Sequence, residues 1–85
     1  MTWQVIWEKR AADALRRLDA VTARRIGRAV TRLAELEQGD VKRLHGRDRE
    51  WRLRVGDWRI RFRYEPATHS MIILHVLPRG RAYRD

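Results

Sequence analysis

The chain contains no cysteine, and only Lys9 and Lys42 of its twenty basic residues are lysine. Without cysteine the protein can form neither a disulfide framework nor a thiolate metal site. Its histidines, His45, His69 and His75, are not spaced as metal ligands are and have no paired acidic residues close by. We therefore expect no metal and no cofactor.

Long apolar runs are also missing. No stretch approaches the length of a membrane-spanning helix. Residues 1–4 carry no basic flank followed by an apolar segment, so we expect no secretory signal. A chain of 85 residues makes one small domain, 1–85. Such a domain buries roughly 60–65% of its unfolded surface and has only a modest core. We expect a single cytoplasmic domain without membrane contact.

Positive charge is abundant. The formal net charge is +9 and the pI is about 11.5, which favours a polyanionic partner. Arginine also presents a planar fork that grips phosphate with two hydrogen bonds and stays protonated at working pH. The excess of arginine over lysine is equally explained by the base composition of the source genome. That explanation does not account for how the arginines are arranged.

Apolar residues and arginines alternate strictly on both sides of Gly56-Asp57. The apolar positions are Trp51, Leu53, Val55, Trp58, Ile60, Phe62 and Tyr64, with an arginine at each position between. Because successive side chains of a strand leave on opposite faces, 51–55 and 58–64 predict a hairpin with one apolar face and one guanidinium face. Like charges on adjacent strands repel, so something anionic is expected to compensate.

The remaining elements follow from apolar spacing and breakers. We expect a strand at 3–7, a helix at 9–18, and a second helix from Thr22 or Val21 to 38, ended by Gly39-Asp40. The apolar stripe of the second helix is Ile26, Ala29, Val30, Leu33 and Leu36, with a solvated row of arginines opposite it at positions 24, 28 and 32. A basic loop at 41–49, a turn at 66–68 and a strand at 71–77, ended by Pro78, complete the chain.

The order strand, helix, helix, strand, strand, strand predicts an α+β fold, with a helical hairpin packed on one face of a small antiparallel sheet. The tryptophan-rich face would meet the helices, with Trp51, Trp58 and Tyr64 as core residues. The arginine face would stay open.

No Ser–His or Cys–His pair and no carboxylate pair suggests acid–base or nucleophilic catalysis. Asp57, Glu50 and Glu65 are expected to be local salt-bridge partners. Arginine suits the stabilisation of charge that develops on phosphate, and RNA carries its own nucleophile, the 2′-hydroxyl. Tyr83 could stack on a base or pass a proton. From these residues alone, RNA binding and RNA cleavage both remain open.

Four segments, in order, resemble one family. They are the Trp-Glu-Lys-Arg-Ala run at 7–11, Lys-Arg-Leu-His-Gly at 42–46, the hairpin at 51–59, and Arg-Gly-Arg-Ala-Tyr-Arg at 79–84. Together they resemble the RelE/ParE superfamily of toxins from type II toxin–antitoxin modules. RelE-type members are metal-independent endoribonucleases that cut messenger RNA on the ribosome. ParE-type members share the fold but inhibit DNA gyrase without nuclease activity, and this is the alternative.

The resemblance implies a set of working residues and a partner. The implied catalytic residues are Arg52, Arg54, Arg59, Arg79 and Tyr83, with Lys42, Arg43 and Arg61 as further RNA contacts. Arg54 takes the position of the base and Arg79 that of the acid, although a guanidinium is a poor proton acceptor. Many relatives have Gly-His where this chain has Leu77-Pro78, and His75 could compensate. The resemblance also implies an acidic antitoxin that wraps the toxin, and the arginine face could receive it.

Overall fold

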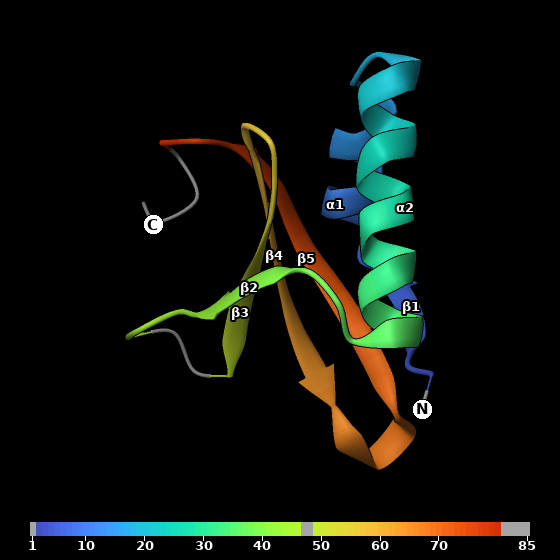
Figure 1. The fold of residues 1–85 in the computed structure, drawn as a ribbon, viewed down its shortest axis with the longest axis vertical. Coiled ribbons are helices and arrows are strands. Elements are labelled where there is room, and N and C mark those ends of the chain that lie inside the picture. The colour runs from blue at the N-terminus through green and yellow to red at the C-terminus, as the bar shows by residue number, and fades with distance from the viewer. Residues whose placement is uncertain (1, 47–48, 81–85) are drawn as a thin grey trace.

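The computed structural model describes residues 2–46 and 49–80. Its elements are β1 (Gln4–Trp7), α1 (Lys9–Arg16), α2 (Ala20–Leu36), β2 (Asp40–Arg43), β3 (Glu50–Val55), β4 (Trp58–Glu65), a 3₁₀ turn (Pro66–Thr68) and β5 (Ser70–Pro78). Both helices lie on one side of a twisted sheet (Figure 1). The predicted α+β class, with a helical hairpin on one face, is confirmed.

The sheet is mixed, which corrects the expectation of an antiparallel one. Its strand order is β1-β5-β4-β3-β2, and β1 runs parallel to β5 whereas the other pairs are antiparallel. Parallel neighbours need a long connection between them, and the helices and middle strands supply it. Since β5 is apolar along most of its length, it is suited to a central position between β1 and β4.

The expectation of a basic loop at 41–49 is wrong at its start. Asp40–Arg43 forms the edge strand β2, which pairs antiparallel with β3, so that Asp40 faces Arg54 and Arg43 faces Trp51. Of its four residues only Val41 is even partly buried. With Val41 as its one apolar residue, β2 shows no alternation of apolar and polar side chains in the sequence. The strand forms by pairing with the edge of β3.

The core lies between α2 and the apolar faces of the central strands. Its largest fully buried side chains include Phe62, Ile26, Ile60 and Met71. Trp51, Trp58 and Tyr64 are half-buried and pack against this core, as predicted. Leu36, at the end of the predicted apolar stripe of α2, is instead exposed.

Both helices differ from prediction at their ends. Helix α2 begins at Ala20 because Asp19 is its N-cap: the Asp19 carboxylate accepts a hydrogen bond of 3.0 Å from the backbone N–H of Thr22. The helix ends two residues early, at Leu36, where Glu37 adopts the left-handed conformation with φ 54°. Helix α1 likewise ends at Arg16 instead of position 18.

Two substitutions in α2 test where this core lies. Ile26 is fully buried and Val21 is exposed. We expect Ile26→Ala to lower the free energy of unfolding by about 2–5 kcal/mol, since it leaves a cavity. Val21→Ala should change it by less than about 0.5 kcal/mol. Urea denaturation followed by tryptophan fluorescence measures both, and equal effects would contradict this packing.

Candidate functional site

The strand register arranges the predicted site residues in two rows on the sheet face opposite the helices. Directly paired residues of neighbouring strands point to the same face. The first row is Lys42, Arg52, Arg61 and His75; the second is Asp40, Arg54, Arg59 and Leu77. The predicted guanidinium face therefore exists, with arginines of β3 directly opposite arginines of β4.

This face is not the open array expected from the sequence, because two of the three β4 arginines, Arg59 and Arg61, are buried. Arg61 is 4% exposed, and its Nε donates a hydrogen bond of 3.0 Å to the carboxylate of Glu50. Arg59 is 8% exposed, and its Nη1 donates to the carbonyl oxygens of Gly56 and Trp58 at 2.9 and 3.1 Å. Arg59 and Arg61 thus each have acceptors within the fold, which offset the repulsion from the arginines opposite them.

The predicted roles of the glutamates as local salt-bridge partners are confirmed. Glu50 pairs with Arg61, and Glu65 accepts a hydrogen bond of 2.9 Å from Arg63. The acids that compensate the arginine face therefore come from the protein itself. While these pairs are intact, the buried guanidinium of Arg61 is occupied.

The two β3 arginines share one acid but differ in exposure. Nη1 of Arg52 donates to the backbone oxygen of Asp40 at 2.9 Å and to its carboxylate at 3.1 Å. Nε of Arg54 lies 3.7 Å from the other carboxylate oxygen of Asp40. The side chain of Arg52 is mostly buried, whereas that of Arg54 is 56% exposed. Arg54 is consequently the member of this pair that can reach a ligand.

Arg79 lies beside the hairpin turn. Its backbone N–H donates a hydrogen bond of 2.8 Å to the carbonyl oxygen of Asp57, and its side chain is exposed. Arg54 and Arg59 form the row next to the same turn. Three of the predicted catalytic residues, from three strand ends, therefore gather at one end of the sheet. Tyr83 lies outside the described residues.

The further RNA contacts predicted from sequence do not share a surface. Lys42 pairs with Arg52 and is exposed on the guanidinium face, whereas Arg43 pairs with Trp51 and so lies on the opposite, helix-side face. Arg61 is buried. A loop at 41–49, as predicted from the sequence, has no regular alternation of side chains and so does not indicate that Lys42 and Arg43 lie on opposite faces.

His75 faces the guanidinium side, next to Arg61. It is half-buried, and burial, followed by the charges of Arg61 and Arg10, lowers the pKa of its imidazole below the usual 6.5. The ring is therefore neutral near pH 7 and can accept a proton.

An apolar groove of about 740 Å³ lies between β1 and the two helices, and sequence reasoning missed it. Its apolar lining includes Val5, Trp7, Leu15 and Leu36, and Arg24 and Arg28 border it. Leu36 is the one sequence signal of this groove: it continues the apolar stripe of α2 but lines the groove. From the sequence alone, Leu36 is indistinguishable from a core residue.

Two kinds of site do not occur in the described part of the chain. Residues 2–46 and 49–80 include no cluster of three metal-ligating acids or histidines. None of the helices there is long and apolar enough to cross a membrane.

Comparison with known proteins places this small α+β domain among bacterial and archaeal toxins. The sequence model described as "ParE toxin of type II toxin-antitoxin system, parDE" matches residues 5–83. The chain therefore belongs to the RelE/ParE family of type II toxin–antitoxin toxins. No curated protein matches.

Solved structures share the fold. The toxin in the archaeal RelE–RelB complex from Pyrococcus horikoshii is 31% identical, with a TM-score of 0.77 over 96% of this chain and 100% of that one. The Mycobacterium tuberculosis RelBE2 complex gives 21% identity and a TM-score of 0.79 over 93% and 100% of the two chains. Isolated Escherichia coli RelE is 13% identical, with a TM-score of 0.77 over 95% of this chain and 88% of that one. At this identity the likeness is one of fold alone.

Arg61 and Arg54 differ in what their loss should cost. Arg61→Gln removes a buried guanidinium and leaves the half-buried Glu50 carboxylate without its partner, and we expect it to lower the free energy of unfolding by about 3 kcal/mol. Arg54→Gln removes an exposed charge and should cost less than about 1 kcal/mol. Chemical denaturation measures both. Adding Glu50→Gln to Arg61→Gln should recover part of the loss, and no recovery would contradict the pairing.

His75 should make stability depend on pH. Its pKa is lower in the folded state than in the unfolded one, so the unfolded chain binds the extra proton. The contribution of neutral His75 is complete above about pH 6.5 and decreases as the pH falls below it. We expect His75→Gln to lose less stability than the parent between pH 7 and 5, measured by thermal unfolding. His45→Gln, at an exposed position, is the control and should follow the parent.

Proposed function

We propose that the protein is a cytoplasmic toxin that cleaves messenger RNA on the ribosome, without a metal. The observation that supports this most is the gathering of Arg54, Arg59 and Arg79 at the hairpin end of the sheet. Two of these side chains, Arg54 and Arg79, are exposed. Guanidinium groups that converge from different strands suit one phosphodiester, whose charge increases during cleavage.

In this reaction the 2′-oxygen of a ribose attacks the adjacent phosphorus while the 5′-oxygen of the next nucleotide leaves. Arg54 and Arg79 stabilise the charge on the phosphate, and Arg59 holds the turn beside them through its bonds to the carbonyls of Gly56 and Trp58. Arg52 holds Asp40 through a hydrogen bond, and Asp40 in turn lies beside Arg54. Alignment of the reacting atoms and charge stabilisation supply most of the acceleration.

The proton of the 2′-hydroxyl needs an acceptor, and a guanidinium is unsuited to accept it. Neutral His75, on the same sheet face, is the acceptor that we propose. Tyr83, from the resemblance alone, stacks on a base or gives a proton to the leaving oxygen.

We propose that a cognate acidic antitoxin inhibits the protein. The P. horikoshii relative was solved as a complex of RelE with RelB. A net charge of +9 favours an acidic partner here. The groove between β1 and the helices has the apolar lining and bordering arginines that the apolar face of an acidic amphipathic helix would need.

Inhibition of DNA gyrase is the second candidate. It is favoured by one observation, the match over residues 5–83 to the model named for the ParE toxin. The burial of Arg59 and Arg61 is also compatible with it, because it leaves fewer cations for RNA.

Primer extension on messages from expressing cells tests the proposal. We expect cuts at ribosome-positioned codons for the parent protein. Arg79→Gln and Arg54→Gln should reduce cleavage about 100-fold or more, since each removes a group that stabilises the transition state. Arg17→Gln, at the exposed end of α1, removes the same charge and should cut normally.

The opposite outcome is equally clear. Intact messages together with DNA breaks and filamentation in cells that express the parent would replace the nuclease proposal with gyrase inhibition. His75→Gln separates the proton acceptor from the phosphate contacts: it should slow cleavage of bound RNA while leaving the affinity for purified ribosomes unchanged.

A further inference from the structure

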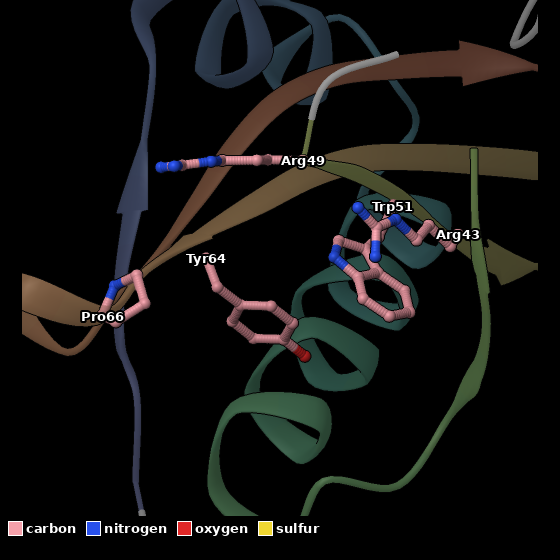
Figure 2. Close-up of a pocket in the computed structure, with 5 residues that line it drawn as sticks. All are labelled: Arg43, Arg49, Trp51, Tyr64 and Pro66. Atoms are coloured by element: carbon pink, nitrogen blue, oxygen red, sulfur yellow. The ribbon is translucent and has the colours of Figure 1, made fainter. Parts of the chain in front are cut away.

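A small pocket opens on the helix-side face of the sheet, at the end away from the hairpin turn. It has a volume of about 210 Å³ and is lined by Arg43, Arg49, Trp51, Tyr64 and Pro66. Figure 2 shows the Tyr64 ring between Pro66 and Trp51, with the guanidinium of Arg43 beside the indole and the side chain of Arg49 extended across the Tyr64 side. Two flat aromatic side chains and two cations thus border one hollow.

The aromatic wall is held in place by packing. The rings of Trp51 and Tyr64 meet edge to face, with centroids 6.2 Å apart. The Tyr64 ring also packs against Trp3 and Phe62, with ring centroids 4.5 and 5.3 Å from its own. Trp51 and Tyr64 are both only half-buried. Fixed rings with exposed surface are what a stacked ligand needs, because little freedom is lost when it binds.

The cations of this pocket differ from those of the guanidinium face. In the part of the chain that the structure describes, neither Arg43 nor Arg49 forms an ion pair with a carboxylate. The guanidinium carbon of Arg43 lies 5.9 Å from the centre of the Trp51 ring. By contrast, Arg52 pairs with Asp40 and Arg61 pairs with Glu50. Within the described residues, the pocket therefore has two arginines without an ion-pair partner beside an aromatic surface.

The backbone at Arg49 adds a further sign of a built site. Arg49 has φ 59°, a left-handed conformation that a side chain-bearing residue rarely adopts. Such strain persists where the surroundings require it and often occurs at binding sites. Here it precedes β3 directly, so that Arg49 and Trp51 enter the pocket from the same strand end.

We propose that this pocket binds one unpaired nucleotide of single-stranded RNA, with the base against Trp51 and Tyr64 and a phosphate between Arg43 and Arg49. Aromatic faces and guanidinium planes are the groups with which proteins hold unstacked bases. The inference deepens the proposed function, on which its choice of RNA rests. Four residues along β3 separate Trp51 from Val55, about 13 Å, so this nucleotide is distinct from the one that is cut.

A nucleotide matches the pocket better than an acidic peptide does. A peptide carboxylate could pair with the arginines but would leave the exposed ring surfaces without a partner. Tyr64 adds a hydrogen-bond donor, because a tyrosine hydroxyl is protonated at neutral pH. Burial, and then the nearby charge of Glu37, raise its pKa further. Base edges carry acceptors that can use this donor.

The Trp51 indole N–H provides a local reporter in ¹H–¹⁵N NMR spectra of the full chain, assigned by comparison with Trp51→Phe. The probe is a tetranucleotide RNA with 2′-deoxy substitutions, which cannot be cleaved. An oligomer of the same length with abasic sites has the same phosphates, and a glutamate-rich peptide supplies charge alone. We expect the RNA to shift the Trp51 signal at concentrations about ten-fold lower than the abasic oligomer.

The variants separate stacking from charge. Trp51→Leu should remove the preference for the RNA over the abasic oligomer, and Trp51→Phe should keep most of it. Arg43→Gln and Arg49→Gln should each weaken both oligomers and reduce the slope of log affinity against log salt by about 0.7. Arg17→Gln is the matched charge control and should leave the Trp51 titration unchanged.

Three results would overturn the inference: equal binding of RNA and abasic oligomer, tighter binding of the peptide, or a Trp51 signal that no oligomer shifts. None of them decides whether the protein cleaves RNA, because the probe is inert and Arg54 and Arg79 do not line this pocket. Conversely, if messages stay intact in cells while the purified protein shows the selective Trp51 response, the nuclease proposal fails and the RNA-binding proposal stands.

Discussion

The pairing of β3 with β4 is the constraint on which the rest of the structure depends. Its register sets Arg52 opposite Arg61 and Arg54 opposite Arg59, an arrangement that repels. The apolar side chains between them fix the register, since a slip of one residue would turn every arginine towards the helices. The repulsion is relieved locally by Glu50, by Asp40 and by the carbonyls of the turn.

This compensation divides the arginines of the predicted site and of the helix-side pocket into two groups. The side chains of Arg59, Arg61 and Arg52 are buried or nearly so. Their guanidinium groups bind acceptors within the fold. Arg54 and Arg79 at the hairpin end, and Arg43 and Arg49 at the opposite end, remain exposed. Net charge alone is therefore a poor guide to the binding surface of this protein, because the most regular arginines in its sequence include the most buried ones.

Sequence patterns were sufficient wherever apolar periodicity was strong. The α+β class, the hairpin around Gly56-Asp57, the two helices and the half-buried Trp51, Trp58 and Tyr64 all follow from alternation or helical spacing. Strand β2 could not be predicted, because its pairing depends on an edge that exists only in the folded sheet. The parallel β1–β5 pair joins the two ends of the chain, and no local pattern encodes such a contact.

The candidate site was predictable in its residue types and less so in its geometry. Alternation places Arg52, Arg54, Arg59 and Arg61 on one face but cannot show which acceptor each of them meets. The 11-residue separation of Glu50 from Arg61 is closed only by the hairpin. The sequence predicts a loop at Arg43, whereas the position of Arg43 against Trp51 follows from the pairing of β2 with β3.

The sheet ends on both sides in strands of only four residues, β1 and β2. Unpaired backbone groups at such margins can recruit strands from other molecules, and brevity and charge are the usual protection. Asp40, Lys42 and Arg43 supply that charge on β2. A second copy that docked there would gain few hydrogen bonds and would bring cationic side chains together, so the fold itself discourages self-association into extended ribbons.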